Sequence, residues 1–198
     1  MRTRKVVSSR VDQSAILLVL LSLAGARELA AQVFTPTYMA PQGTSELGLY
    51  ISDGPGDFAL EGIWRNDLGD IDVGIRAGLA DTQDLTLLVG GEIRSPLILA
   101  DPLEMAVTGH VQGAFGDAEG LGILAGLTLG QTFEVDELAF TPYLHPRLGL
   151  VDNLGNDDLD LDLLADFGLD VRITPELDLR LGIGFGSPVD WGIGFAWR

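Results

Sequence analysis

The segment from Asp158 to Phe185 reads DLDLDLLADFGLDVRITPELDLRLGIGF. On both sides of the break at Thr174-Pro175-Glu176, apolar residues occupy every second position, and aspartate, arginine or glycine lies between most of them. Because successive side chains of a β-strand point to opposite faces, this alternation predicts a two-stranded hairpin with one apolar and one charged face. The fold depends on which of these faces meets water.

The same alternation recurs from Glu46 to the end of the chain, in segments separated by turn-forming Gly, Pro, Asn and Asp. Apart from an apolar run near the N-terminus, no window shows a sustained helical period. The sequence therefore predicts an all-β fold of ten antiparallel strands, with eight as the alternative. The expected strands cover residues 46–51, 58–65, 71–79, 85–94, 103–115, 121–131, 138–151, 159–173, 177–185 and 191–197.

The beginning of the chain has the plan of a secretory signal peptide. Basic residues between Arg2 and Arg10 precede an apolar core, Ala15–Ala26, which is shorter than the ~20 residues of a membrane-spanning helix. Small residues suited to cleavage follow, and we expect cleavage after Ala31, with Ala26 as the alternative. The expected divisions are a signal peptide (1–31), an extended lead-in (32–45) and a β-barrel (46–198).

Removal of residues 1–31 would leave a strongly acidic chain. Those residues contain five of the 12 basic and two of the 29 acidic residues, so 7 basic and 27 acidic residues remain, a formal net charge of −20. Nucleic-acid binding needs clustered Lys and Arg, so this balance excludes nucleic acid as a partner. The chain has no cysteine, so an exported form must be stabilised by something other than disulfides.

The charged residues of the predicted strands share one face, and no charged residue falls on an apolar face. In a soluble sandwich the charged face would meet water. In a membrane barrel the charged face would line the lumen and the apolar face would meet lipid. The charged residues predicted to line such a lumen are Glu61, Arg65, Asp72, Arg76, Glu92, Arg94, Arg147, Asp166, Asp170, Arg172, Asp178 and Arg180.

Two features of the charged face favour a closed interior. It is rich in glycine, which weakens an exposed strand but suits a crowded and curved lumen. Aspartate and arginine also recur together on this face. This pattern suits a closed interior, because buried charges must be paired. In the C-terminal hairpin we therefore expect contacts between Asp170 or Arg172 and Asp178 or Arg180.

The apolar face carries aromatic residues at the ends of two strands. Phe58 and Trp64 bracket one predicted strand, and Trp191 and Trp197 bracket the last. Aromatic residues at both ends of a lipid-facing strand form the interfacial girdle of membrane barrels. Together with the glycine-rich charged face, these residues favour a membrane barrel over a soluble sandwich.

The chain resembles bacterial outer-membrane β-barrel proteins in its signal peptide, acidic hairpins, TPE-type turn and final strand, Trp191-Gly-Ile-Gly-Phe-Ala-Trp197. The resemblance implies that Trp191, Ile193, Phe195 and Trp197 form the C-terminal signal read by the barrel-assembly machinery, although Arg198 follows the last aromatic residue. It further implies a closed up-and-down transmembrane β-barrel in the outer membrane of a Gram-negative bacterium. Outer-membrane lipid and the assembly machinery would be its partners, and both termini would face the periplasm.

Catalysis and metal binding have little support in the sequence. The two histidines, His110 and His145, are expected on inner faces of non-adjacent strands, with no evident serine or threonine partner. The acidic turn Asp152–Asp158 does not match the spacing of the twelve-residue calcium loop. We therefore expect no enzyme activity, no metal and no cofactor.

Pro142 and Pro146 conflict with a closed barrel. Proline removes a donor from the strand ladder, and a closed barrel has no free edge on which to place it. We therefore expect this strand to start near Tyr143 and to carry a bulge at Pro146.

Barrels of this size have interiors just wide enough for side chains. We therefore expect a structural or narrow-pore role, with an Asp/Arg/Gly-lined lumen that is plugged or passes small solutes. The excess of carboxylates favours cationic or neutral solutes. The alternative is a secreted soluble β-barrel or sandwich that binds a small ligand. A barrel enzyme is a third hypothesis, which requires His110 or His145 beside a nucleophile or carboxylate at a rim of the barrel.

Overall fold

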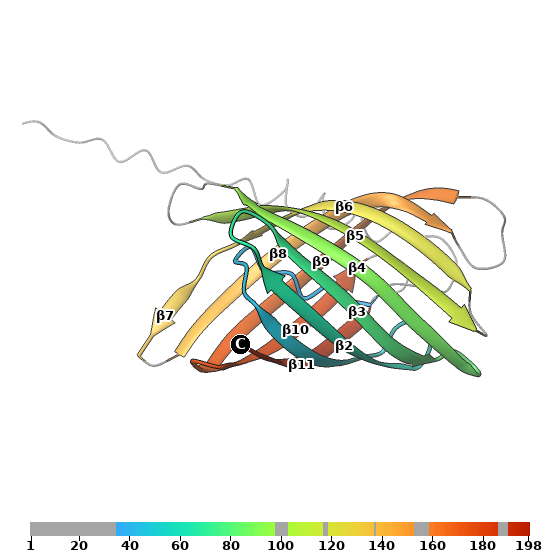
Figure 1. The fold of residues 1–198 in the computed structure, drawn as a ribbon, viewed down its shortest axis with the longest axis horizontal. Helices are drawn as coiled ribbons and strands as arrows, with labels where there is room; N and C mark the ends of the chain where they lie inside the picture. Colours follow the sequence, from blue (N-terminus) through green and yellow to red (C-terminus); the bar gives the residue numbers. More distant parts are fainter. Residues whose placement is uncertain (1–34, 98–102, 117–118, 137, 153–158, 186–189) are drawn as a thin grey trace, which may run out of the picture.

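The computed structural model describes residues 35–97, 103–116, 119–136, 138–152, 159–185 and 190–198, which form a barrel of antiparallel strands (Figure 1). The predicted signal peptide, residues 1–31, lies outside the described residues. Among the described residues, no helix is long and apolar enough to cross a membrane. The strands in the described part of the chain are β1 (Glu46–Ser52), β2 (Phe58–Asp67), β3 (Asp72–Asp81), β4 (Leu85–Leu97), β5 (Glu104–Gly116), β6 (Gly120–Gly130), β7 (Phe133–Val135), β8 (Leu138–Asp152), β9 (Leu159–Thr174), β10 (Leu177–Phe185) and β11 (Asp190–Trp197).

Pairing of the first strand with the last closes the sheet into a barrel. From β1 to β6, and again from β8 to β11, each strand pairs antiparallel with the next. Strand β1 also pairs with β11, and β6 pairs with β8. The short β7 pairs with β8 in line with β6, so it prolongs β6. The predicted closed antiparallel barrel of ten strands is confirmed.

The barrel has two ends with different connections. Because its ten strands alternate in direction, β1 begins and β11 finishes at the same end, which we call the terminal end (Figure 1). At the opposite end, called the far end, each connection between strands has six residues or fewer. The terminal end also carries the hairpin of β7 and β8, which projects beyond its neighbours (Figure 1).

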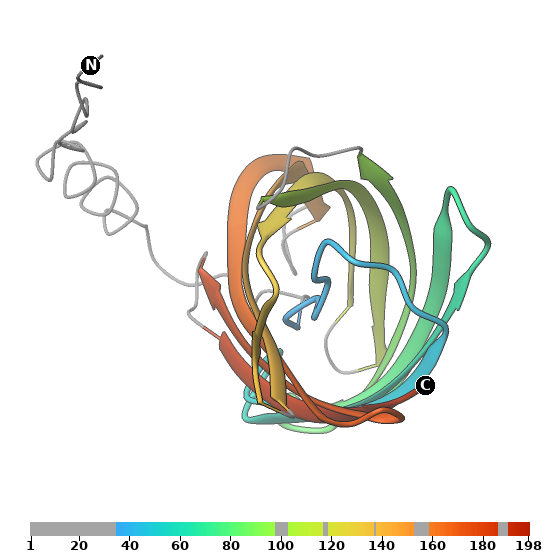
Figure 2. The same cartoon turned by 90° about the vertical axis from the view of Figure 1, so that its left-hand side faces the viewer.

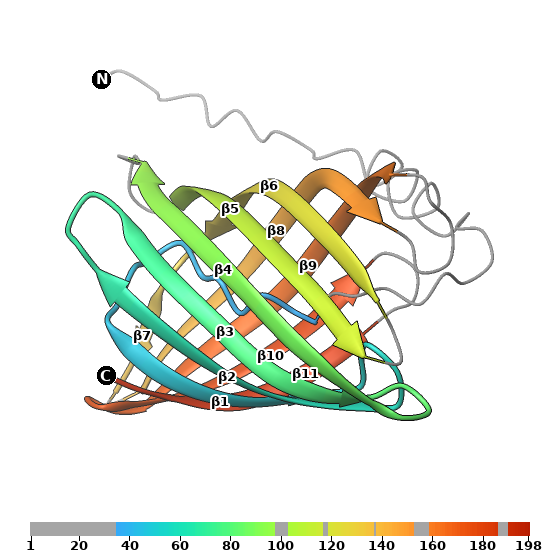
Figure 3. The same ribbon diagram turned by 45° about the vertical axis from the view of Figure 1, so that its right-hand side comes forward.

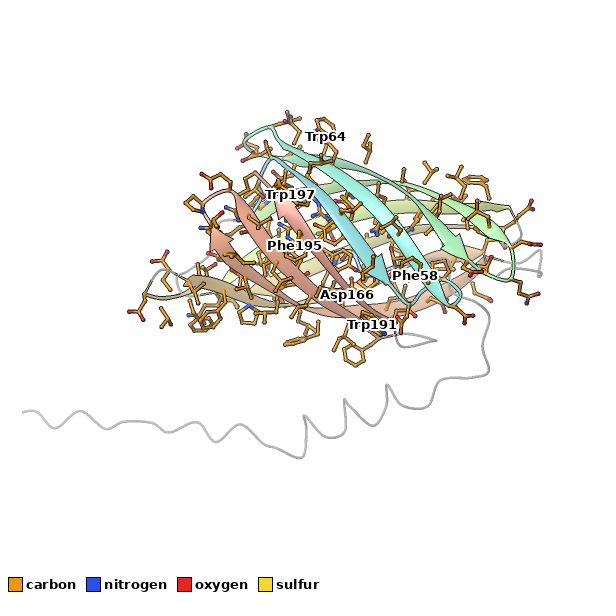
Figure 4. The ribbon with its side chains drawn as sticks, turned by 90° about the horizontal axis from the view of Figure 1, so that it is seen from below. Phe58, Trp64, Asp166, Trp191, Phe195 and Trp197 are labelled. Carbon is orange, nitrogen blue, oxygen red and sulfur yellow. The ribbon has the colours of Figure 1, made fainter. Side chains whose placement is uncertain are left out.

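The outer surface of the barrel is apolar and its inner surface is buried (Figure 4). On β1, Leu49 is 51% exposed whereas the next residue, Tyr50, is 2% exposed. On β3, Ile75 is 62% exposed and Arg76 is 1% exposed. The alternation read from the sequence thus places leucine, isoleucine and valine outside and the arginines inside.

Strand β8 differs from the sequence prediction. It starts at Leu138 rather than near Tyr143, and its register with β9 runs without a bulge along its whole length. Pairing with β6 is interrupted between Leu144 and Arg147, but the register is the same on both sides of the gap. The prediction of a bulge at Pro146 was wrong because the unbroken ladder to β9 keeps the strand straight while the proline costs pairing on one side.

The lead-in lies inside the barrel. Figures 2 and 3 show residues 35–45, in blue, running through the lumen before they join β1 at the terminal end. Residues 35–41 are buried and belong to no helix or strand. The sequence predicted an extended conformation for this segment but gave no sign that it occupies the lumen.

A layer of apolar side chains fills the inner surface toward the far end. These side chains are small or branched, come from seven barrel strands and pack together in one buried cluster. The lumen therefore has a charged layer around the lead-in and an apolar layer beyond it. The apolar layer consists of Ala59, Ala80, Leu88, Ala114, Leu124, Val151 and Leu164.

Closure of the barrel predicts that two introduced cysteines can form a disulfide across the β1–β11 seam. Leu49 and Phe195 are direct partners on the outer face, so cysteines at both positions should be oxidised to an intramolecular bond, because cross-strand Cβ atoms lie ~5 Å apart. A chain without native cysteine makes the shift in electrophoretic mobility unambiguous. Cysteines at Leu49 and Leu179 should not form a disulfide. Leu179 lies on β10 and pairs with Phe195, so β11 separates it from Leu49 on β1. Equal cross-linking of both variants would contradict the seam.

Candidate functional site

The charged lumen is the candidate functional site. The twelve charged residues predicted to line it all lie at inward-facing positions of the strands. Asp170 and Arg172 are partly exposed, near the terminal end. The other ten are each at most 6% exposed: Glu61, Arg65, Asp72, Arg76, Glu92, Arg94, Arg147, Asp166, Asp178 and Arg180.

Glu46 joins the two sides of the β1–β11 seam. Its carboxylate lies 2.6 Å from Nη1 of Arg65 on β2 and 2.5 Å from Nη1 of Arg180 on β10. Arg65 continues the network, since its Nε also pairs with Glu92 on β4. The sequence placed Glu46 on the polar face, but its position between two arginines depends on closure of the barrel.

The charge pairs expected in the C-terminal hairpin are confirmed. Arg180 Nε lies 3.2 Å from Asp170 Oδ2, and Arg172 Nε lies 3.7 Å from Asp178 Oδ1. Asp178 has a second and closer partner in Arg198, whose Nη2 lies 2.5 Å away. The C-terminal arginine therefore turns inward, and Trp197 is the last outward-facing residue of β11.

The other wall arginines pair with carboxylates of nearby strands. In each pair both side chains are buried, so the two charges neutralise each other away from water. The pairs are Arg76 with Glu61 (2.6 Å), Arg94 with Asp72 (2.7 Å) and Arg147 with Asp166 (2.6 Å).

The wall also binds the backbone of the lead-in. Five consecutive carbonyl oxygens, from residue 36 to residue 40, each accept a hydrogen bond from a wall side chain. The donors come from five different strands: Arg76 to Pro36 (3.3 Å), Arg65 to Thr37 (2.8 Å), Arg180 to Tyr38 (3.3 Å), Thr128 to Met39 (2.8 Å) and Arg94 to Ala40 (2.5 Å).

Side chains of the lead-in add contacts to the wall. Thr37 donates its hydroxyl to Asp166 at 2.6 Å, and its backbone N–H donates to the same carboxylate at 3.2 Å. Thr35 donates to Glu61. The ring of Tyr38 stacks on Tyr50 of β1, with centroids 4.2 Å apart.

Inward-facing glycines provide the space that these rings occupy. A Cβ added at Gly182 would lie 3.1 Å from Pro36 Cβ and 3.2 Å from Tyr38 Cε1. A Cβ at Gly192 would lie 2.9 Å from Tyr38 Cζ. The sequence argument explained these glycines by a crowded and curved lumen, and at these two positions it is the lead-in that occupies the space they leave.

His145 lies at the centre of a buried hydrogen-bond cluster. Its Nδ1 is 2.8 Å from the hydroxyl of Thr37 and 3.6 Å from Asp166, and its Nε2 is 2.7 Å from the hydroxyl of Thr108. The expectation that His145 would lack a threonine partner was wrong, since one partner belongs to the lead-in and the other to β5. The His145 side chain is fully buried, so this cluster holds the lead-in and offers no access to a substrate.

Metal binding has no support in the described part of the chain, where no group of three or more His, Cys, Asp or Glu residues could hold an ion. Most of the acidic turn 152–158 lies outside the described residues. Nothing in the described lumen indicates catalysis.

The open space around the lead-in is small inside the barrel and larger at the terminal end. Beside Arg172 and Arg198 a cavity measures about 20 Å³, which is room for about one water molecule. An open depression of about 460 Å³ at the terminal end is lined by Gln42, Gly43 and Glu104, among others. The link between the lumen segment and β1 therefore lies at an accessible mouth.

The four predicted interface aromatics form two rows on the outer surface (Figure 4). Trp64 and Trp197 both pair with Leu47, at the terminal end. At the far end, Phe58 is the first residue of β2 and Trp191 is the second residue of β11, and each lies next to a partner of Ser52. Their rings are about half exposed, and Trp191, Phe195 and Trp197 project from the outer face of β11 together with the less exposed Ile193.

Three solved structures illustrate what the fold is similar to. The KdgM porin in complex with disordered oligogalacturonate has a TM-score of 0.46 and 8% identity, over 78% of this chain and 98% of that chain. A chain from the de novo design of transmembrane β-barrels has a TM-score of 0.39 and 17% identity, over 79% and 97%. A bacterial polysaccharide outer membrane secretin has a TM-score of 0.45 and 8% identity, over 76% and 57%. No protein-family model matches the chain, and no curated protein matches it.

The pairing around Glu46 predicts a large cost for neutralising this residue. In Glu46→Gln, two buried guanidinium groups lose a shared partner, which should lower the free energy of unfolding by about 3–5 kcal/mol. Arg172→Gln should cost at most ~1 kcal/mol, because Arg172 is partly exposed and Asp178 keeps Arg198. Urea unfolding in lipid vesicles, followed by tryptophan fluorescence, measures both. Similar losses for the two variants would contradict the central role of Glu46.

Proposed function

We propose that the mature chain is an outer-membrane β-barrel of a Gram-negative bacterium, with a structural or narrow-pore role and a lumen closed by its own lead-in. One observation carries this proposal: the surface is reversed relative to a soluble protein. Leucine, isoleucine, valine and aromatic side chains cover the outside, while the arginines and carboxylates are sealed inside. In water such a barrel would expose its apolar side chains, but in a bilayer those side chains contact lipid.

The outer face argues against the soluble alternative. Soluble monomers rarely expose contiguous apolar patches larger than a few hundred Å², and here exposed apolar residues are found on every barrel strand. A soluble barrel that binds a small ligand would also keep an apolar cavity for it. The lumen of this chain holds charge pairs and a peptide segment instead.

The ends of the barrel support a membrane position. The aromatic rows of Trp64 with Trp197 and of Phe58 with Trp191 would lie at the two interfaces with lipid headgroups. The terminal end would face the periplasm, where the barrel-assembly machinery would read the outer face of β11. The inward turn of Arg198 toward Asp178 supports this reading, because it leaves Trp197 as the final outward residue.

The charge of the lumen supports a preference for cations or neutral solutes. Among the buried side chains that the structure describes, seven carboxylates face five arginines. An excess of carboxylates along a narrow path lowers the energy of a cation and raises that of an anion. The lead-in and the apolar layer leave little free space, so any conductance should be small.

A charge on the outer face tests the membrane position. Leu49→Arg should lower the stability of the barrel in lipid vesicles by about 2–4 kcal/mol, because Leu49 lies between the two aromatic rows. Leu68→Arg, in the turn between β2 and β3, should change stability by ~1 kcal/mol or less. Fractionation provides the cellular test, with a heat-modifiable band in detergent-extracted outer membranes as the expected result. Release of the native chain into buffer, with Leu49→Arg neutral, would support the soluble alternative.

Planar bilayer recordings test the narrow-pore role. The intact barrel should show small conductance, and a gradient of KCl should give a reversal potential of the sign that indicates cation preference. An anion-selective current would contradict the selectivity, and a large stable current would contradict the closed lumen.

A further inference from the structure

We infer that the lumen wall is a binding site for an uncharged peptide without regular secondary structure, and that residues 35–41 occupy it as a tethered ligand. This inference deepens the proposed function by naming the ligand class of the lumen. It rests on the proposed barrel for its place in a membrane, but its chemistry can be measured in detergent micelles.

The wall recognises the backbone of the segment. Five consecutive carbonyls are bound by side chains of β2, β3, β4, β6 and β10, so the donors surround the peptide. The segment makes no regular secondary structure of its own. Its conformation is therefore set by the wall, in the way that a binding site orders a flexible ligand.

The segment is complementary to the wall in charge. Residues 35–45 read TPTYMAPQGTS and contain no ionisable acid or base other than the tyrosine hydroxyl. The wall arginines are already neutralised by wall carboxylates, so a charged ligand would disturb these pairs. After pairing, the guanidinium groups still have N–H donors to satisfy, and neutral carbonyl oxygens satisfy them without adding charge.

The two prolines of the segment suit this role. Pro36 and Pro41 have no backbone N–H, so they bring acceptors to a donor-rich wall without adding donors that need partners. Proline also fixes its own φ angle, which lowers the backbone entropy lost when the segment is ordered.

Side chains set the position of the peptide in the site. Thr37 is held by Asp166 and His145, and Tyr38 fits against Tyr50 over the space left by Gly182. These contacts select one register out of those that the backbone contacts alone would permit. They also identify which changes in a peptide should weaken binding.

The test uses the full barrel, assembled before the link to the lead-in is cut. A site-specific protease sequence is inserted between Gly43 and Thr44, beside the open depression at the terminal end. After folding in detergent micelles and cleavage, a fluorescent peptide with the sequence of residues 35–43, acetylated and amidated, is added and its anisotropy is followed. The uncut barrel provides the matched occupied control.

The cut barrel should exchange its original segment for the added peptide, whereas the uncut barrel should bind none. A peptide that carries both Thr37→Val and Tyr38→Ala should bind at least tenfold more weakly. In the wall, Gly182→Ala should weaken the unchanged peptide several-fold, because its Cβ would crowd Pro36 and Tyr38. Gly62→Ala is the control, since its Cβ would lie on the outer surface in ordinary contact with the carbonyl oxygen of Ala77, at 3.9 Å, and it should change binding by less than twofold.

Three results would overturn the inference: no peptide binding by the cut barrel, equal binding of the native and the doubly changed peptide, or equal effects of the two glycine variants. Failure of the proposed function would look different. It would appear as neutral behaviour of Leu49→Arg and absence from outer membranes, while peptide exchange in micelles would be unaffected.

Discussion

The structure depends on pairing arginine with carboxylate in an interior that is sealed from water. A single unpaired charge in such a place costs several kcal/mol, so the arginines can be tolerated only where the barrel brings a carboxylate to each. Glu46 shows how this requirement for paired charges links distant strands. It binds Arg65 and Arg180, which are distant in sequence, and these contacts exist only when β1 lies between β2 and β11. Closure of the barrel and neutralisation of these two arginines are therefore the same event.

The same constraint explains why a peptide lies in the lumen. A guanidinium group has five N–H donors, and a carboxylate satisfies only some of them. The remaining donors need acceptors that do not change the charge balance. The carbonyls of residues 36–40 meet this need, and inward glycines such as Gly182 and Gly192 leave space for the side chains that come with them.

The sequence predicts the barrel well because one simple period controls it. Alternation of apolar and charged residues assigns each side chain to a face, and confinement of charge to one face separates lipid from lumen. The pairs in the C-terminal hairpin follow as well, because Asp170 and Arg180 lie opposite each other across one tight turn. These features depend on local pattern, which a single chain displays directly.

Contacts between distant parts of the chain could not be predicted in the same way. The partners of Glu46 depend on the register across the seam, which no local pattern specifies. The lead-in has no period and no charge, so its only signal is negative: a proline-containing, uncharged segment next to strands whose arginines need acceptors. Pro146 misled the prediction because loss of pairing on one side of β8 does not bend a strand that is fully paired on the other.

Steric closure alone does not account for the lead-in. Toward the far end, Leu88, Leu124 and their apolar neighbours already pack together inside the barrel, so a barrel that needed only a physical block has one there. What the apolar layer cannot supply is a set of acceptors for Arg65, Arg76, Arg94 and Arg180. The lead-in is therefore explained better as a ligand that satisfies the charged layer than as a stopper that fills a hole. A ligand bound through its backbone can be replaced by another peptide of the same chemistry, whereas a stopper that only fills space has no such counterpart.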